Sequence, residues 1–518
     1  MLARTFDSPE PQAGGALSRT WLRWCAATLA FGTLVTLNSG GYRYGAADQA
    51  FYIPAVVRHL VPEAFPSDRV LIDAQSAFTV WDDATAWLSR TAGIDLPTLF
   101  LAGYLLTTML FAWGILGIGD RLYRSSRATW ALLAALTLKH RIAHTGVNTF
   151  EGYFHPRVLA FGLGLVAVGV LWSGRWAVAV VLVLACALAH PTTALWFGIW
   201  IAIAVLVAHG SARVRLGLAI SAAAIAVLAT WLLGPQRLTA VMDPAWTVTF
   251  ANKDYLFPTE WNAATWATNL LSPALLLALA AARAREGTLT RDERGVLAGA
   301  LALFVVFLVS LPLVHARMAL AVQLQVSRVF WALELLASAY LVWWLAEAKW
   351  RHLAWPAAAR GLIVLSLFST AALARGAYVM FVEHRERPVA QVQLPEGPWR
   401  EVAGWASAHT PIDASFLVDP GHAWKYGLGF RLAAMRDVYL EEDKDTAIAF
   451  YSRAVALRVR DRIDALPDFA QLTPGRAREL GARYGLDFVV SDRPMDLAEV
   501  FRNERFFVYR IEGGTEAR

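Results

Sequence analysis

The sequence predicts an α-helical polytopic membrane protein followed by a soluble α/β domain. Of its 518 residues, 57% are apolar and 17% are charged, whereas soluble domains average about 45–50% and about 25%. Residues 1–382 hold 28 basic and 19 acidic side chains, and residues 383–518 hold 19 and 22. This distribution predicts a multi-span membrane domain over 1–382 and a soluble domain over 383–518, and it argues against nucleic-acid binding. Both cysteines, Cys25 and Cys186, lie in apolar runs, so disulfides have no part in the predicted fold.

Eleven apolar stretches are the predicted membrane spans. A helix rises about 1.5 Å per residue, so a hydrocarbon core of about 30 Å requires about 20 residues. The stretches that meet or approach this length are 20–39, 97–118, 128–139, 157–173, 176–190, 192–209, 215–234, 263–282, 295–314, 328–347 and 359–379. The first follows a basic N-terminus, as in a signal peptide, but Arg23 can snorkel to the interface and we predict an uncleaved anchor. His190-Pro191 separates the fifth stretch from the sixth, either as a tight turn or as a break.

The basic residues between these stretches predict the orientation of the chain. With the N-terminus inside, every inner loop contains arginine or lysine, as the positive-inside rule requires. An odd number of spans then predicts a multi-pass protein of the cytoplasmic (inner) membrane with an extracytoplasmic C-terminal domain. The outer loops are longer and more polar, and they comprise residues 40–95, 139–157, 235–261 and 315–327. We therefore expect the chemistry on the outer face.

The C-terminal domain is predicted to be a compact α/β unit. Short apolar runs at Phe416–Val418, Phe488–Val490 and Phe506–Tyr509 predict strands, and residues 444–465 and 473–484 predict helices. It contains no Gly-rich phosphate loop, no metal-spaced Cys/His set and no Gly-x-Ser-x-Gly motif. A role in recognition or as a lid is therefore favoured over bond-making.

The first outer loop contains two acidic candidates. Asp48 precedes an amphipathic run, Ala50–Leu60, that would lie along the membrane surface. Its carboxylate is either the N-cap of that helix or a group presented to a lipid-borne substrate. Asp82 and Asp83 either bind a divalent cation or belong to a solvated helical face.

The second outer loop is the most suggestive segment. Residues 139–157 contain three histidines, three basic residues and Glu151, and His155 and Arg157 lie at the start of the fourth apolar stretch. A charge at mid-depth in a bilayer costs about 2.5–3.5 kcal/mol, so such charges are kept where they face a cavity or a partner. Snorkelling explains Lys139 or Arg157 singly, but it explains the whole cluster less well.

Arg317 and Arg328 flank the last outer loop, where the positive-inside rule disfavours arginine. An anionic ligand such as a diphosphate or phosphodiester would account for both side chains through charge-assisted hydrogen bonds. The structural alternative is an ion pair with Glu334. His190, in the turn between two stretches, is either part of such a site or only a helix-capping histidine.

This arrangement resembles the membrane glycosyltransferases of the GT-C superfamily, which have many spans, a long first outer loop with an early acid, and a C-terminal outer domain. The segments Tyr484–Val490 and Phe506–Arg510 also look like the tails of uncharacterised relatives in this group. The resemblance implies a GT-C-like fold, a polyprenyl-phosphate-linked sugar donor and an acceptor hydroxyl or amide. It also implies a role in the cell envelope, and a divalent cation (Mg²⁺ or Mn²⁺) in some members.

The resemblance assigns roles to the candidate residues. Asp48 matches the first-loop acid that acts at the acceptor or metal, with Asp82-Asp83 as its rival, and Glu151 matches a second-loop acid of some members. Arg317 or Arg328 would match the phosphate-binding position. Substrate or phosphate contacts are expected from Arg157, Arg317, Arg328, His155 and His190, catalysis from Asp48 and Glu151, and a metal site from Asp82 and Asp83. A carboxylate base would draw a proton from the acceptor while cations stabilise the departing phosphate.

Two other classes of function remain open at this point. The chain could be a transporter or flippase of lipid-linked saccharide, but it shows no convincing internal repeat, and His190-Pro191 and Pro312 are its only candidate helix breaks. It could also be a non-catalytic assembly protein, which would leave the charged second loop without a purpose.

Overall fold

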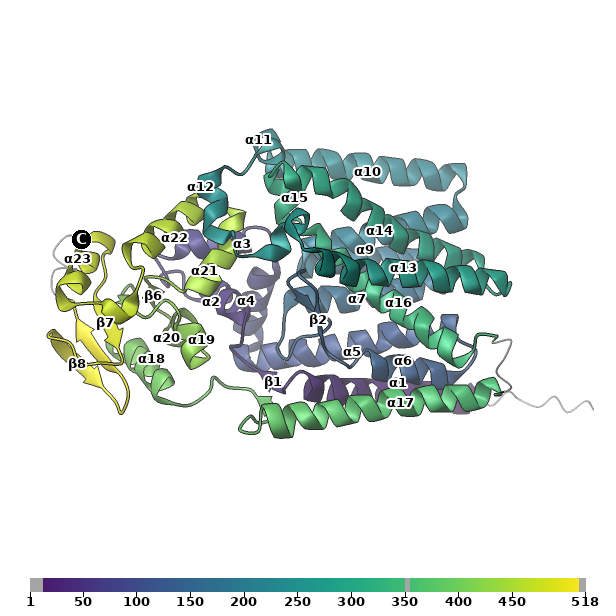
Figure 1. Ribbon diagram of the computed structural model, residues 1–518, viewed down its shortest axis with the longest axis horizontal. Helices are drawn as coiled ribbons and strands as arrows, with labels where there is room; N and C mark the ends of the chain where they lie inside the picture. Colours follow the sequence, from purple (N-terminus) through teal and green to yellow (C-terminus); the bar gives the residue numbers. More distant parts are fainter. Residues whose placement is uncertain (1–12, 350–354, 512–518) are drawn as a thin grey trace, which may run out of the picture.

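The computed structural model describes residues 13–349 and 355–511, and it is mostly helical. Each of the eleven apolar stretches folds as a helix, and these helices run side by side in one bundle (Figure 1). Their bounds are α1 Ala13–Asn38, α5 Leu96–Leu122, α6 Ser126–Ala135, α7 Pro156–Trp172, α8 Trp176–Ala189, α9 Pro191–His209, α10 Ala212–Leu233, α13 Ala263–Arg285, α14 Arg291–His315, α16 Val329–Ala346 and α17 Ala357–Tyr378.

Six helical segments of the described chain are long and apolar enough to cross a membrane. They are Leu96–Leu122, Pro191–His209, Ala263–Arg285, Arg291–His315, Ala319–Ala346 and Ala357–Glu383, and Pro156–Trp172 and Trp176–Ala189 are shorter apolar helices. The chain is therefore a multi-pass membrane protein by the length and composition of its helices. The count of eleven spans stays a prediction.

Local sequence explains where several helices begin. Thr290 and Glu293 form a capping box at the start of α14, with side-chain and backbone groups bonded in both directions. His190 is extended and caps α9, and Pro191 occupies the first position of that helix. The turn between the fifth and sixth stretches is thus a true boundary between α8 and α9, which pack against each other.

The core of the bundle depends on small residues where helices approach closely. A side chain at Gly114 of α5 would lie 2.5 Å from Cβ of Leu165 on α7, and Gly117 faces Gly169 across the same contact. Deeper in the core, Phe161 stacks on Trp331 with 3.6 Å between ring centroids. This packing holds α7 and α16, which carry two of the candidate arginines at or next to their N-termini.

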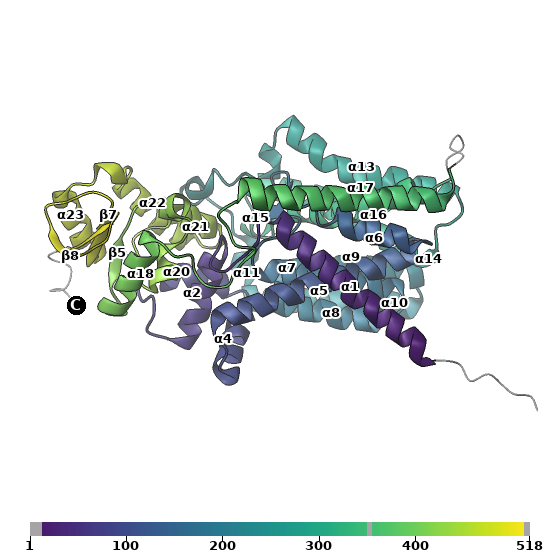
Figure 2. The same cartoon turned by 90° about the horizontal axis from the view of Figure 1, so that it is seen from below.

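The predicted outer loops lie together at the end of the bundle that faces the C-terminal domain (Figures 1 and 2). Their elements are α2 Gln49–Leu60, α3 Arg69–Ser76, α4 Trp81–Ala92, the antiparallel pair β2 Arg141–Ile142 and β3 Val147–Asn148, α11 Pro235–Thr239, α12 Pro244–Thr247, α15 Ala319–Gln323 and η4 Val326–Arg328. A two-residue parallel pairing, between β1 Tyr42–Arg43 and β4 Ala390–Gln391, joins the first loop to the segment that leaves α17. This shared end is what the predicted topology requires.

The C-terminal domain contains a five-stranded sheet of order β6-β5-β7-β9-β8. Its strands are β5 Ser415–Leu417, β6 Asp437–Val438, β7 Phe488–Ser491, β8 Ala498–Arg502 and β9 Phe507–Arg510, parallel from β6 to β7 and antiparallel beyond. The three predicted strands are confirmed. The sequence missed β6, which has only two residues, and β8, an exposed edge strand without a buried apolar run.

The helices of this domain are α18 Pro398–His409, α19 His422–Tyr426, α20 Phe430–Ala434, α21 Glu442–Ile448, α22 Arg453–Ala465 and α23 Pro474–Tyr484. The last of them confirms the helix predicted over 473–484. The single helix predicted over 444–465 is wrong, because the backbone is extended at Ser452 and separates α22 from a short 3₁₀ turn that follows α21. This break leaves α21 as a separate short helix next to the membrane bundle.

Candidate functional site

Asp48 occupies the N-cap position of α2, but its side chain does not cap the helix. Its Oδ2 lies 3.3 Å from Nε2 of His155, and its Oδ1 lies 3.3 Å from Nζ of Lys444 in α21. Burial alone would raise the pKa of Asp48, but Lys444, His155 and Arg157 hold it well below its ordinary value. The carboxylate is therefore ionised at neutral pH, and with 34% of the side chain exposed it is accessible to a substrate.

His155 is a neutral partner of Asp48. It caps α7, where its Nδ1 accepts a hydrogen bond of 3.0 Å from the backbone N–H of Arg157. Because Nδ1 is the acceptor, we assign the ring proton to Nε2, which faces Asp48. Burial and the neighbouring Arg157 lower the pKa of His155 to about 4. His155 thus donates a hydrogen bond to Asp48 without adding a charge.

Glu151 positions Arg157 from the second outer loop. Its carboxylate is 5% exposed, accepts hydrogen bonds of 3.0 and 3.1 Å from Nδ2 of Asn148, and lies 3.9 Å from both Nζ of Lys139 and Nη2 of Arg157. Burial raises the pKa of Glu151 in spite of these two cations. Nε of Arg157 is buried and has no hydrogen-bond partner among the described residues. Its guanidinium therefore keeps donor capacity for a ligand.

A narrow pocket lies between α7, α9, α14 and α16, and Arg157 belongs to its wall. Arg328 and His190 add two further nitrogen-bearing groups, and the remaining lining is largely apolar and aromatic. That lining comprises Phe161, Thr192, Thr193, Trp196, Phe197, Trp200, Leu303, Val329, Trp331 and Ala332. We call this space the donor pocket. It combines cationic groups with an apolar wall that extends into the bundle.

Arg328 has no ion-pair partner in the part of the chain that the structure describes, and its Nε is also without a hydrogen bond. Glu334, its suggested structural partner, is instead paired with His140. His190 caps α9, since its Nδ1 accepts from the backbone N–H of Thr193 at 3.2 Å. His190 therefore both caps α9 and lines the donor pocket.

Arg317 lies outside the donor pocket. Its Nη2 pairs with Glu260, and its guanidinium stacks over the ring of Phe257 at 4.0 Å from the centroid. A structural ion pair was one expectation for this residue, although with a different acid. Of the two arginines that the sequence singled out in the last outer loop, the geometry favours Arg328 for a phosphate.

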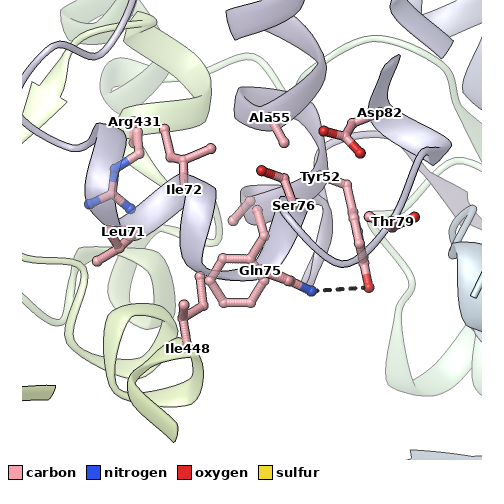
Figure 3. A pocket seen from close by; sticks show the side chains of 12 residues that line it. Tyr52, Ala55, Leu71, Ile72, Gln75, Ser76, Thr79, Asp82, Arg431 and Ile448 are labelled. Carbon is pink, nitrogen blue, oxygen red and sulfur yellow. Dashed lines mark hydrogen bonds between the residues drawn. The ribbon is translucent and has the colours of Figure 1, made fainter. Parts of the chain in front are cut away.

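Asp82 and Asp83 meet His59, which the sequence analysis did not flag. Nε2 of His59 lies 2.9 Å from Asp82, and Nδ1 lies 3.0 Å from Asp83. Asp82 is 2% exposed and also lines a pocket of about 370 Å³ between the first loop and the C-terminal domain (Figure 3). The solvated-face interpretation therefore fits only Asp83, whose side chain is 61% exposed.

The side chains of His59, Asp82 and Asp83 are close enough to hold a metal ion, and their donor atoms suit Mn²⁺ or Mg²⁺. A cation there would lie far from Asp48, because His59 and Asp48 are eleven positions apart at opposite ends of α2, about 16 Å along the axis. The two oxygens of Asp48 already face His155 and Lys444. The divalent cation thus stays a prediction, and the geometry does not place it at Asp48.

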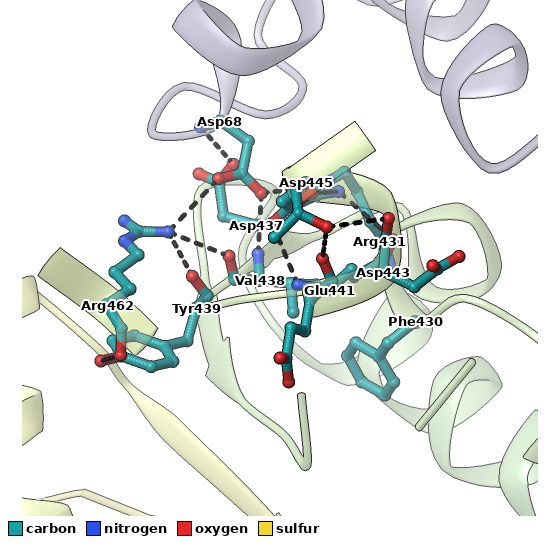
Figure 4. A network of polar contacts seen from close by, with 12 residues as sticks. Asp68, Phe430, Arg431, Asp437, Val438, Tyr439, Glu441, Asp443, Asp445 and Arg462 are labelled. Carbon is teal, nitrogen blue, oxygen red and sulfur yellow. Dashed lines mark hydrogen bonds and ion pairs between the residues drawn. The ribbon is translucent and has the colours of Figure 1, made fainter. Parts of the chain in front are cut away.

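A buried network of charges fixes α21, and with it Lys444, to the first outer loop (Figure 4). Arg431 is 1% exposed, and its guanidinium bonds Asp68 at 2.7 Å, Asp445 at 3.0 Å and Glu441 at 3.3 Å. Asp68 also accepts from the guanidinium of Arg458 at 2.7 Å. Buried charges of this kind are tolerated only when fully paired. The network therefore joins the first loop to the C-terminal domain.

Three of these residues were not predicted from the sequence. Lys444 lies in the acidic run Glu441–Asp445, which is typical of a solvated helix start. Arg431 and His59 have no distinctive neighbours in the sequence. His59 shares the first outer loop with Asp82 and Asp83, so a metal-ligand search of that loop would have found it.

No family model and no curated protein matches the sequence. Among solved structures, the chain is similar to the apo crystal structure of the Archaeoglobus fulgidus oligosaccharyltransferase, with a TM-score of 0.46, 12% identity, and coverage of 90% of this chain and 69% of that chain. It is also similar to oligosaccharyltransferase AglB from Archaeoglobus fulgidus in complex with an inhibitory peptide and a dolichol-phosphate, with a TM-score of 0.38, 13% identity and the same coverage.

Proposed function

We propose that this chain is a membrane glycosyltransferase that transfers a sugar from a polyprenyl-phosphate-linked donor to a hydroxyl or amide of an acceptor. The observation that carries the proposal is the donor pocket, in which Arg157 and Arg328 are combined with an aromatic wall, and in which Arg157 also acts electrostatically on Asp48. A phosphate bound to an isoprenoid chain needs both features, a cationic site for the head and an apolar site for the tail.

The two arginines of the donor pocket suit the phosphate. Guanidinium groups bind phosphate oxygens through paired, charge-assisted hydrogen bonds, and both arginines retain nitrogens without a partner among the described residues. His190 lies on the same wall. The rings of Trp196 and Phe197 then offer the surface along which the isoprenoid would lie.

Asp48 is the proposed catalytic carboxylate. The acceptor oxygen or nitrogen attacks the anomeric carbon of the sugar, the bond from that carbon to the phosphate oxygen breaks, and the acceptor proton passes to Asp48. Arg157 and Arg328 hold the departing phosphate. The low pKa of Asp48 makes it a weak base while Lys444 is close, so the acceptor is expected to take the place of Lys444 at Oδ1. His155 keeps Oδ2 in place throughout.

The same proposal includes the orientation of the chain. We infer that the N-terminus is cytoplasmic and that the loops beside the donor pocket, together with the C-terminal domain, face the outer side of the cytoplasmic membrane. Its support is that the long polar loops lie at the bundle end that faces the C-terminal sheet (Figure 1), whereas the predicted inner loops are rich in arginine.

The test is reconstitution of the full chain in proteoliposomes with a radiolabelled polyprenyl-phosphate sugar and candidate acceptors. We expect sugar transfer that requires Asp48 and the lipid phosphate. Movement of the labelled lipid between leaflets without any transfer would overturn the proposal and identify a flippase instead.

A further inference from the structure

A second polar cavity lies at the same end of the bundle as the donor pocket. It opens to the surface where the ends of α1 and α17 meet the β2–β3 hairpin, and its free volume is about 250 Å³. Its charged and titratable lining comprises Lys139, His140, Arg141, Arg375, Glu383 and His384. Glu151 connects the two spaces, because it contacts Lys139 of this cavity and Arg157 of the donor pocket.

The cavity has an excess of positive charge. Two further cations, Arg43 and Arg375, repel the ammonium group of Lys139 electrostatically. The nearby acids compensate little of this charge, because Glu151 is shared with Arg157 and Glu334 pairs with His140. Glu383, the acid in the lining, is exposed. The balance therefore favours an anionic ligand.

Several donors around the cavity are unsatisfied. Ser39 is 6% exposed and lines the cavity, yet its buried Oγ has no hydrogen-bond partner among the described residues. Nε of Arg43 is also buried and has no hydrogen-bond partner among the described residues. The exposed guanidinium of Arg141 has no ion-pair partner in the described chain. A buried donor without a partner is destabilising, and a ligand with several acceptor oxygens would remove that penalty.

Helix-end stabilisation explains only part of this arrangement. Arg375 donates a hydrogen bond of 2.9 Å to the carbonyl of Asn38 at the C-terminus of α1, where a cation is favourable. That role does not account for Lys139, Arg141 or the unpaired Oγ of Ser39. All three of these residues line the cavity.

We propose that this cavity is a second anion site, separate from the donor pocket, that binds a phosphate ester. Two sources share this chemistry: the head group of an anionic membrane phospholipid and a phosphate carried by the acceptor. The cavity lies at the ends of two apolar helices, where a lipid head group would be located. Two of its lining residues, Lys139 and Asn148, contact Glu151, which borders the proposed reaction centre. The inference does not require that the chain transfers sugar.

The experiment measures binding of two probes to the purified full-length chain in neutral detergent by titration calorimetry. The probes are dihexanoyl phosphatidylglycerol for the lipid source and glycerol 3-phosphate for the soluble source, with dihexanoyl phosphatidylcholine as the uncharged comparison. We expect saturable binding of at least one anionic probe. Lys139→Gln/Arg141→Gln should weaken it by about 10-fold or more, because two charge-assisted bonds are lost.

The matched control is Arg285→Gln, which removes an exposed arginine from the C-terminal end of α13 and should leave binding unchanged. If the double variant fails to fold, the single variant Arg141→Gln, at an exposed residue, replaces it in the binding measurement. Binding of phosphatidylglycerol alone assigns the cavity to a membrane lipid, and binding of glycerol 3-phosphate assigns it to a soluble phosphate. Absence of saturable binding, or binding that survives Lys139→Gln/Arg141→Gln but is lost in Arg328→Ala, would overturn the proposal.

Discussion

Lys444 of the C-terminal domain lies 3.3 Å from Oδ1 of Asp48 in the first outer loop, although 396 residues separate them in the sequence. The domain that the sequence assigned to recognition or to a lid thus supplies a cation to the proposed catalytic carboxylate. Because the Arg431 network anchors α21, this ion pair depends on docking of the domain.

The first prediction concerns this ion pair. Lys444→Met should raise the pKa of Asp48, because the ammonium is the largest influence that lowers it. A reaction that needs the ionised carboxylate is present above that pKa and is lost as the pH falls through it, so the acid limb of the pH–rate profile should move to higher pH. Transfer rates between about pH 3 and pH 8 provide the measurement. Lys425→Met, which removes an exposed lysine paired with Asp419, is the control, and an unmoved acid limb in Lys444→Met would contradict the assignment.

A second prediction separates Asp48 from its rival acids. Asp48→Asn should lower the transfer rate by roughly 10²–10⁴-fold, since an amide cannot take the acceptor proton. Thermal stability should change little, because the side chain makes no capping bond to α2 and the amide oxygen can still accept a hydrogen bond from His155 or Lys444. Asp82→Asn/Asp83→Asn should retain most activity, because these acids lie on α4 and contact His59, which is about 16 Å along α2 from Asp48. A folded and fully active Asp48→Asn enzyme would instead promote the Asp82-Asp83 pair.

The third prediction concerns the phosphate. Arg328→Ala should weaken donor use by about 10-fold or more, because the guanidinium bonds to phosphate would be lost. Arg328→Lys should restore only part of it, since an ammonium lacks the planar fork. Steady-state kinetics with varied donor concentration measure the effect. Arg317→Ala is the matched control, because Arg317 pairs with Glu260 outside the pocket, and equal losses in both variants would argue against the donor pocket.

The fourth prediction concerns the network that holds the C-terminal domain. Arg431→Met should lower the free energy of unfolding by about 3–5 kcal/mol, because it leaves three buried carboxylates without their central cation. Thermal unfolding and limited proteolysis of the C-terminal domain report this loss. Arg460→Met breaks a half-exposed pair with Asp464 and should cost less than about 1 kcal/mol. Similar stabilities for the two variants would contradict the network's role.

The same network predicts how stability depends on pH. Burial opposes ionisation of Asp68 and Glu441, but Arg431 and other partners lower the pKa of each to about 2. A depressed acid pKa stabilises the fold above the unfolded value, so this contribution is complete above about pH 5 and is lost as the pH falls from about 4 to about 2. Asp437 acts in the opposite sense, because burial and Asp68 raise its pKa to about 6. Urea titrations of the wild-type chain and of Arg431→Met at pH 3 and pH 7 should show a smaller difference between the two proteins at the lower pH.

The last prediction is the topology. A reporter fused to the C-terminus should be active only outside the cytoplasm, because the positive loops retain the opposite end of the bundle inside. A fusion within the β2–β3 hairpin, between Ile142 and Val147, tests the same side at a second point. A reporter active in the cytoplasm at either position would reverse the inferred orientation.

The sequence by itself determined the helices and the character of the two regions. Eleven apolar stretches predicted eleven helices of the bundle, and three apolar runs predicted β5, β7 and β9. This succeeds because hydropathy and length are properties of a local segment, and a long apolar segment has few alternatives to a buried or membrane helix. The candidates Asp48, Glu151, His155, Arg157 and Arg328 were also found in the sequence, because charges next to apolar stretches are conspicuous.

Only the tertiary structure decided how these residues associate. It placed Lys444 beside Asp48 and brought His59 into contact with Asp82 and Asp83. It also showed that Arg328 lines the donor pocket, whereas Arg317 forms an ion pair with Glu260 outside that pocket. Ion pairs form between whichever side chains the packing brings within a few ångströms, and that approach depends on segments hundreds of residues apart. A lysine in an acidic run has the same local sequence whether it faces water or a carboxylate from another domain, so no local pattern could have shown its role.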